Sequence, residues 1–360
     1  MIGDVTLRNC VFCGNKPEAK SGEHILPRWL LSLTGDPSRT MHLGPFPGRA
    51  QPFMEMSFSS FRFPACKRCN ERYSQLEGSA KAVFLSLLAR EPLGASDFDL
   101  LMDWFDKVRV GLWLGGLMLG ENPFGIDPNF RIDSRMGRKD RALIIYAAPP
   151  GQIGLRITGA NTPAFACSPT CFSLAVNGLV IENISTDFLV AKHMGLPYPR
   201  GFRYLPDGSI RCRVPFISGT QRLAPRPLPL SADYRGTVVI QAVYLDYRAY
   251  EPGAYSNEYV TRMSLTPDKS LPVVCNGSES HLYPLPKASD WLPKQEFSFS
   301  DLILRVFRQT LSNQMELLRR VRLSSEIPPA LRRSQRNQYA EYIKFNKGLL
   351  KRVAEDYPPS

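Results

Sequence analysis

The stretch SGEHILPRWL (Ser21 to Leu30) places a glutamate directly before the first histidine of the chain, between two pairs of cysteines. CVFC (Cys10 to Cys13) precedes it and CKRCN (Cys66 to Asn70) follows it. Each Cys-x-x-Cys pair can turn two thiolates toward one ion, and two such pairs complete a tetrahedral zinc site. Four buried cysteines or a redox pair are the alternatives, but neither requires the repeated spacing. We therefore expect a structural zinc ion held by Cys10, Cys13, Cys66 and Cys69.

The composition is that of an ordinary globular protein with an excess of positive charge. The 360 residues are 43% hydrophobic and 22% charged, and the formal net charge is +12. Such an excess favours a polyanionic partner, and nucleic acid before others. The N-terminus lacks the apolar stretch of a signal peptide, and the most apolar run, Val110 to Gly120, is too short to span a membrane. We expect a cytoplasmic protein with no membrane partner, whose reduced thiols bind metal more readily than they form disulfides.

The pattern of the chain changes twice, which predicts an α+β protein in three parts. Residues 1–92 hold both cysteine pairs, residues 93–290 combine a helix with β-rich runs, and residues 291–360 are helical and basic. In the first part, Arg39 to Phe53 reads as a loop and Met54 to Phe63 as a strand. Apolar residues at helical spacing predict a helix over 67–88, starting at the second cysteine pair.

The middle part begins with a predicted helix and continues with strands. SDFDLLMDWFDKVRVGLWLGGLML (Ser96 to Leu119) predicts a helix capped by Ser96, with Asp99 completing a capping box. Strands are expected within Ala142 to Ala148, Cys171 to Asn183 and Gly236 to Tyr247, and the Asn-Gly pair in VNGLV predicts a hairpin turn. The remaining cysteines are expected to be structural: Cys167, Cys171, Cys212 and Cys275.

The last sixty residues predict two helices that carry half of the net charge. Apolar residues mark one face of the first helix (Ile303, Phe307, Leu311, Leu318 and Val321). Pro328 and Pro329 interrupt the pattern before a second helix from about Leu331 to Glu355. A solvated helix face and a nucleic-acid contact explain the basic residues equally well. These residues are Arg305, Arg308, Arg319, Arg320, Arg322, Arg332, Arg333, Arg336, Lys344, Lys347, Lys351 and Arg352.

The motifs of residues 8 to 90 resemble the HNH endonuclease superfamily, whose fold is the ββα-metal module. The resemblance is to a branch that reads Cys-x-x-Cys-Gly, then Glu-His-x-x-Pro, then Cys-x-x-Cys-Asn before a helix with Leu-Glu. It covers about a quarter of the chain. It implies a zinc-bound ββα-metal module with His24 as general base and with Glu23 and Asn70 as ligands of a catalytic Mg²⁺ or Mn²⁺.

These roles fit the chemistry of phosphodiester hydrolysis, which needs a base to activate water and a cation to stabilise the charged phosphate. A histidine suits the first task because its usual pKa lies near neutrality. Four basic residues beside the motifs are candidate phosphate contacts, although a solvated face explains each of them as well: Arg28, Lys67, Arg68 and Arg72. Glu77, in SQLE, is either a group behind the site or a partner in a helix ion pair.

The chain departs from the family pattern at one position. The middle asparagine of the HNH motif is missing from MSFSSFRFPAC, where only Ser59 or Ser60 could replace it. This puts catalytic efficiency in doubt more than the fold. His24 could also be a structural histidine, Glu23 an exposed acid and Asn70 a helix cap. His42 is expected to lie on the surface.

The leading hypothesis is a metal-dependent endonuclease that acts on nucleic acid, with DNA favoured over RNA, in a defence setting such as phage defence or in a mobile element. The first alternative is a zinc-containing protein that binds nucleic acid on the same scaffold without cutting it. An unrelated enzyme in the C-terminal part is a third, although no phosphate loop, nucleophile elbow or His-Glu-x-x-His motif supports it. A second copy of the chain or a regulatory protein is a further candidate partner.

Overall fold

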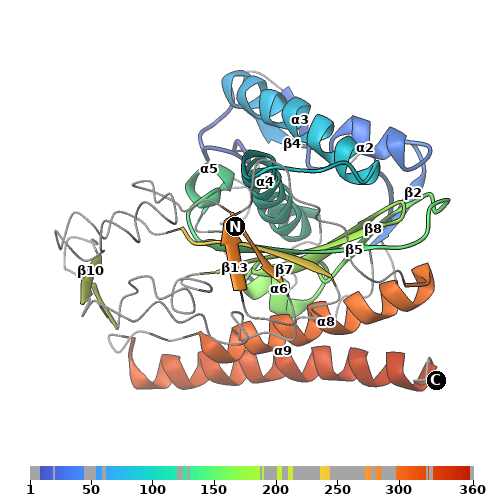
Figure 1. Ribbon diagram of the computed structural model, residues 1–360. Coiled ribbons are helices and arrows are strands. Elements are labelled where there is room, and N and C mark those ends of the chain that lie inside the picture. The colour runs from blue at the N-terminus through green and yellow to red at the C-terminus, as the bar shows by residue number, and fades with distance from the viewer. Residues whose placement is uncertain are drawn as a thin grey trace.

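A seven-stranded antiparallel sheet forms the centre of the computed structural model (Figure 1). The structure describes residues 9–18, 21–43, 54–58, 62–119, 125–126, 128, 130–186, 189, 201–204, 210–213, 236–243, 272–276, 281–284, 297–321, 323 and 327–356. Within these residues the strand order is β13 (His281–Pro284), β12 (Val273–Asn276), β11 (Thr237–Gln241), β5 (Asp140–Ala147), β8 (Leu179–Thr186), β7 (Cys171–Val176) and β6 (Leu155–Thr158).

Helices lie on both faces of this sheet, so the predicted mixed α+β class is confirmed. The helices of the described residues are α2 (Arg28–Leu33), α3 (Lys67–Leu88), α4 (Ala95–Leu119), α5 (Ile132–Arg135), α6 (Pro163–Cys167), α8 (Phe299–Arg320) and α9 (Pro329–Asp356). Helix α4 packs on one face of the sheet and α3 packs on α4, whereas α8 packs on the other face and α9 packs on α8 (Figure 1).

Three two-stranded ladders lie outside the central sheet. They are β1 (Ser21–His24) with β4 (Arg62–Ala65), β2 (Thr40–Leu43) with β3 (Met54–Ser57), and β9 (Gly201–Tyr204) with β10 (Ile210–Arg213). The interpretation of Arg39 to Phe53 as a loop is therefore wrong for residues 40–43. The strand predicted from Met54 to Phe63 is present as two strands, because residues 54–57 pair with β2 and residues 62–63 pair with β1.

The strongest local patterns predicted their elements well. Helix α3 spans Lys67–Leu88 as expected, and Asn177 and Gly178 form the turn between β7 and β8. Asn177 has φ 53°, which a type I′ turn requires and asparagine tolerates. Strand β5 is buried along its whole length, because a central strand with helices on both faces has no solvent side.

Two helices begin at other residues than predicted, and the buried side of α8 holds other residues than predicted. Helix α4 begins at Ala95, so Ser96 lies inside its first turn, and the Gly94 N–H donates to Asp97 Oδ2 at 2.8 Å. Asp99 instead accepts a hydrogen bond from Arg141. Pro329 begins α9, since the first helical turn tolerates proline. The buried side of α8 includes four polar residues that the apolar pattern excluded: Gln309, Thr310, Asn313 and Gln314.

One hydrophobic core joins the N-terminal part to the sheet. Phe12 from the first cysteine loop, Trp104 of α4 and Ile145 of β5 belong to the same buried cluster. A Cβ atom at Gly111 would lie 3.2 Å from Ile25, so this glycine of the apolar run lets α4 approach the segment after β1. The predicted divisions at residues 92 and 290 stay predictions, and hydrophobic packing is continuous across the first of them.

Candidate metal centre and the Glu23–His24 strand

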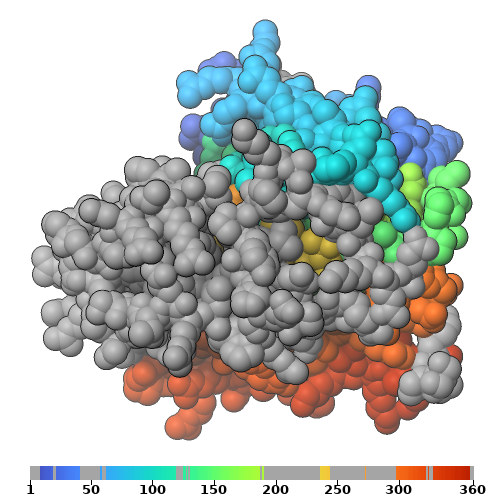
Figure 2. All heavy atoms as spheres, viewed as in Figure 1, coloured from blue at the N-terminus to red at the C-terminus, as the bar shows by residue number. Residues whose placement is uncertain are grey.

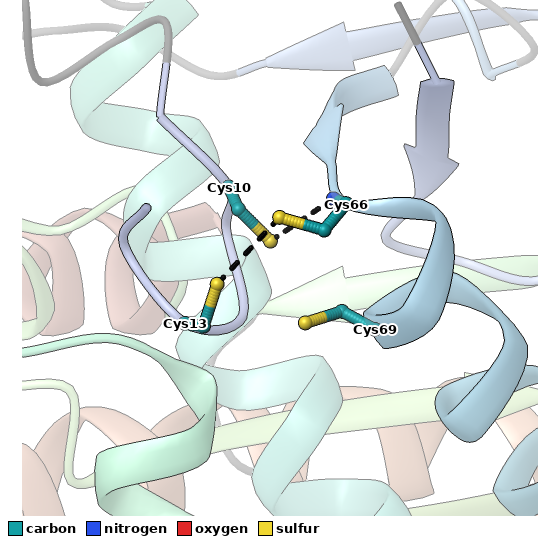
Figure 3. Close-up of side chains that lie close together, drawn as sticks. All are labelled: Cys10, Cys13, Cys66 and Cys69. Atoms are coloured by element: carbon teal, nitrogen blue, oxygen red, sulfur yellow. Dashed lines mark hydrogen bonds between the residues drawn. The ribbon is translucent and has the colours of Figure 1, made fainter. Parts of the chain in front are cut away.

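The four cysteines of the two pairs converge on one point. Cys10 and Cys13 come from the turn at residues 10–13, while Cys66 is the N-cap of α3 and Cys69 lies in its first turn (Figure 3). Their four sulfur atoms lie within 4.8 Å of one another, and the Sγ atoms of Cys13 and Cys66 are 3.7 Å apart. Zinc bound at about 2.3 Å to each sulfur places sulfurs roughly 3.8 Å apart, so the group fits this ion.

Backbone geometry shapes the first cysteine loop. Gly14 has φ 80° and its N–H donates to the Cys10 carbonyl at 2.9 Å, which turns the chain so that both thiols face inward. The Cys66 N–H donates to Cys10 Sγ at 3.3 Å. N–H groups directed at a sulfur are typical of thiolate ligands of a metal.

The pKa values of the thiols show why a cation belongs between them. Burial, and then the neighbouring thiols, raise the pKa of Cys66 to about 12 and that of Cys69 as well. Burial also acts to raise the pKa of Cys10, but the N–H groups of Cys13 and Cys66 outweigh it and the pKa is lowered. Crowded thiols cannot all ionise without an opposing charge. Four sulfur ligands leave no open position, so a bound zinc ion would have a structural role.

The cysteine loop also connects the N-terminal part to α5. The carbonyls of Val11 and Phe12 accept hydrogen bonds from the N–H groups of Ile132 at 3.3 Å and Asp133 at 3.1 Å. The ring of Phe12 stacks on Tyr73 of α3, with centroids 4.0 Å apart, and the Tyr73 hydroxyl donates to Asp133. Arg72, a predicted phosphate contact, forms an ion pair with Asp133 as well. A metal in this loop would therefore hold α3 and α5 together.

Glu23 and His24 end the first strand of a strand–strand–helix unit. Strand β1 pairs antiparallel with β4, with Glu23 opposite Phe63 and His24 opposite Arg62. Strand β4 leads through Cys66 directly into α3. Asn70 is half-buried in the first turn of that helix, and its N–H donates to the Cys66 carbonyl at 2.9 Å.

Glu23 is a buried carboxylate that binds a lysine which sequence reasoning missed. The ammonium of Lys107, on α4, lies 2.6 Å from Glu23 Oε1 and also pairs with Glu77 of α3. It donates a further hydrogen bond of 3.3 Å to the His24 carbonyl. Lys107 is only 1% exposed. Burial, and then the charge of Glu23, outweigh the lysine and raise the pKa of Glu77. The available signal in the sequence was the one lysine of α4, which lies just before its apolar run.

His24 holds a neutral imidazole at neutral pH. Burial, followed by the positive charges of Arg62, Arg28 and Lys107, lowers its pKa to about 4. Both ring nitrogens are buried and have no hydrogen-bond partner among the described residues. Buried polar atoms are almost always paired, so an imidazole of this kind is suited to a bound water molecule or ligand.

The remaining predicted residues lie at the surface or outside the described residues. Arg28, Lys67, Arg68 and Arg72 are all exposed, and Lys67 lies 4.0 Å from Glu71. Ser59, Ser60 and His193 lie outside the described residues, and only the backbone of His42 and His281 is described. Among the described residues, the four cysteines form the only group of three or more His, Cys, Asp or Glu ligands.

Comparisons of the chain with protein-family models, curated proteins and solved structures gave no match. Among the helices of the described residues, none is long and apolar enough to cross a membrane.

Proposed function

We propose that the N-terminal part is an HNH-type endonuclease module that hydrolyses phosphodiester bonds of nucleic acid, with DNA favoured. The observation that carries this proposal is the strand–strand–helix unit in which Glu23 and His24 end the first strand. A cysteine group that fits zinc lies at the junction of the second strand and the helix. This is the order of elements in the ββα-metal fold that the motifs resemble.

His24 would act as the general base. Its pKa near 4 keeps the imidazole unprotonated at pH 7, and neither ring nitrogen is engaged by a described residue. It can therefore accept a proton from a water molecule whose oxygen attacks the phosphorus atom. The bond from phosphorus to the 3′ oxygen breaks, and the leaving oxygen takes up a proton. A base with so low a pKa is weak, so this step alone gives only part of a nuclease's rate.

A catalytic Mg²⁺ or Mn²⁺ would supply charge stabilisation to the phosphate, with Glu23 and Asn70 as the expected ligands. The described arrangement does not fit such an ion, because Glu23 Oε1 binds the Lys107 ammonium and Glu23 belongs to no group of three or more metal ligands among the described residues. No step of the proposed reaction is assigned to a divalent ion. The zinc assignment is independent of this result, since it rests on four sulfurs.

The ion pair between Glu23 and Lys107 supports a second candidate function. A lysine that neutralises the expected metal ligand is what a zinc module without catalytic activity would carry. Such a module would bind nucleic acid through exposed basic residues and leave it intact. The missing middle asparagine of the motif supports the same alternative.

Plasmid cleavage separates the two candidates. Purified wild type, His24→Ala and His42→Ala would be incubated with supercoiled plasmid and with single-stranded DNA and RNA, adding Mg²⁺ or Mn²⁺. We expect wild type and His42→Ala to cut, and His24→Ala to lose activity by a factor of about 10² or more. The His42 variant carries the same substitution outside the β1–β4 pair, and thermal melts would verify that all three proteins fold. Intact substrates with every protein, or equal cutting by the His24 variant, would overturn the nuclease proposal.

A further inference from the structure

The exposed side of α9 carries a straight row of five positive charges. At 3.6 residues per turn, these side chains fall within about 80° of one another around the helix and extend over roughly 27 Å along its axis. All are exposed, and the side chains of Lys344 and Lys351 are 80% and 78% accessible. We name this surface the α9 stripe; it consists of Arg333, Arg336, Lys344, Lys347 and Lys351.

The opposite side of α9 is fixed to the protein. Tyr342 and Asn346 are buried there, and the Asn346 amide donates to Gln314 Oε1 of α8 at 3.1 Å. Tyr342 packs with Ala164 of α6 and Leu318 of α8. Helix α9 runs along the lower edge of the molecule in Figure 1, and Figure 2 shows this edge at the surface. The stripe therefore points away from the protein, on a helix whose other side is held by these contacts.

Acidic neighbours neutralise little of this charge. Glu341 lies 3.8 Å from Lys344 and Glu355 lies 3.7 Å from Lys351, but all four side chains are at least 60% accessible. Ion pairs so exposed contribute less than about 1 kcal/mol and give way readily to a stronger anion. No described residue forms a salt bridge with the other three members of the stripe.

The side chains around the stripe indicate which polyanion fits. Asn337, Ala340 and Gly348 lie between the cations, so a phosphate backbone can approach closely. Aromatic residues, which stack the bases of single strands, are turned to the protein side, as Tyr339 and Tyr342 show. The stripe side also has no large apolar residue to insert into a membrane surface. Rigid, closely spaced phosphates match a straight row of lysine and arginine.

We propose that the α9 stripe binds the phosphate backbone of double-stranded DNA without reading its sequence. The stripe lies on the opposite side of the central sheet from α3 (Figure 1), so this binding does not depend on the proposed nuclease. A duplex held on α9 would be kept at the protein by contacts separate from the Glu23–His24 strand.

Salt-dependent binding to a labelled DNA duplex longer than the stripe tests the proposal, with no divalent ion added. The stripe variant reverses three exposed charges: Arg333→Glu, Lys344→Glu and Lys351→Glu. The control variant makes the same change in net charge at exposed sites elsewhere: Lys16→Glu, Lys81→Glu and Arg138→Glu. A third protein carries glutamine at the three stripe positions, since glutamate beside Glu341 and Glu355 weakens the helix slightly.

We expect both stripe variants to bind the duplex less tightly, and the slope of log K against log salt to fall by about 3. The loss of affinity between about 50 and 200 mM salt would then be roughly forty-fold smaller than for wild type. The control variant should keep most of the wild-type slope. Equal weakening by the control, or unchanged binding by both stripe variants, would overturn the proposal. So would stripe-dependent binding that is tighter to phosphatidylserine vesicles or to single-stranded DNA than to the duplex.

Discussion

Carboxyl groups are buried on both faces of the central sheet, and two sites differ in their partners: cations beneath α4, and uncharged groups around Glu182 beneath α8. On that face, Arg141 of β5 is fully buried and binds three aspartates of α4. On the face beneath α8, Glu182 of β8 is fully buried as well, and its hydrogen-bond partners are all uncharged. Carboxyl groups beside two neighbouring strands, β5 and β8, thus lie in opposite electrostatic surroundings.

The α4 face is an ion-pair cluster. Arg141 lies 3.0 Å from Asp99 and 3.3 Å from Asp106, and it also pairs with Asp103. Asp106 accepts a further bond from the Gly137 N–H at 2.9 Å and pairs with a second arginine, Arg109. Burial acts to raise the pKa of Asp106, but the two arginines outweigh it and the pKa is lowered. The carboxylate stays ionised because the cations are buried with it.

The α8 face solvates its carboxyl group with neutral side chains. Asn313 Nδ2 lies 2.9 Å from Glu182 Oε1, the thiol of Cys171 lies 3.1 Å from the same oxygen, and Gln309 donates to the other oxygen. The Tyr146 hydroxyl donates to Gln309 Oε1 at 3.0 Å. Burial outweighs these hydrogen bonds and raises the pKa of Glu182. Hydrogen bonds without a cation thus do not compensate the loss of water.

Loss of the zinc ion should have the largest effect on stability, and it should follow only from changes to the cysteines of the metal group. Cys69→Ser should no longer bind the zinc ion. The free energy of unfolding should then fall by the contribution of the bound metal, on the order of 10 kcal/mol. Cys167→Ser makes the same change in α6, at a thiol that packs beside Tyr339 of α9, and should keep the ion. Metal content by mass spectrometry and thermal unfolding with and without a chelator would measure both effects. Full metal content in the Cys69 variant would refute the zinc assignment.

Arg141→Met should have the next largest effect. It removes the buried guanidinium that pairs with Asp99, Asp103 and Asp106, so we expect a loss of about 3–5 kcal/mol. Because the pKa of Asp106 is lowered in the folded protein, its stabilisation is present above the unfolded value of about 3.9 and is lost as the pH falls below it. The variant should therefore lose less stability on acidification than wild type. Urea unfolding across pH would measure the free energy of unfolding of wild type, Arg141→Met and the control Arg138→Met, which changes an exposed arginine. Equal behaviour of the two variants would contradict the prediction.

Local patterns explain which parts of this comparison could be predicted from sequence. Three patterns are local, since each is formed by residues close together in the chain: the spacing within each cysteine pair, the period of α3 and the Asn-Gly turn. They predicted the cysteine group, the helix and the hairpin. Lys107 and Arg141 bind acids that lie between 30 and 84 residues away in the chain, so no periodicity reports them. The glutamines and asparagine of α8 resemble a solvent side in sequence. They are buried because their partners lie on or beside the sheet: Gln309 and Asn313 bind Glu182, and Gln314 binds the carbonyls of Gly159 and Cys171.

Glu182→Gln should have the smallest effect and a pH dependence of the opposite kind. Glutamine can replace the carboxyl group if the Gln309 amide turns over, since the Tyr146 hydroxyl can accept as well as donate. We expect a change within about 1 kcal/mol near pH 4. The raised pKa means that the folded state keeps this proton to higher pH than the unfolded state, whose pKa is about 4.3. As the pH rises from the unfolded pKa through the raised pKa of the folded state, Glu182 progressively lowers the stability of wild type. The variant has no carboxyl group at this position, so it does not show this loss.

Urea unfolding of wild type and Glu182→Gln from about pH 4 to pH 8 would measure this trend. The variant should gain stability relative to wild type as the pH rises, while the effect of Asp106 on the other face is confined to pH values below about 3.9. A constant difference between the two proteins across this range would mean that the pKa of Glu182 is the same in the folded and unfolded states, so that the buried group is ionised at neutral pH. The face beneath α8 would then have to stabilise a buried carboxylate with amides alone, and the cations beneath α4 would not be what separates the two faces.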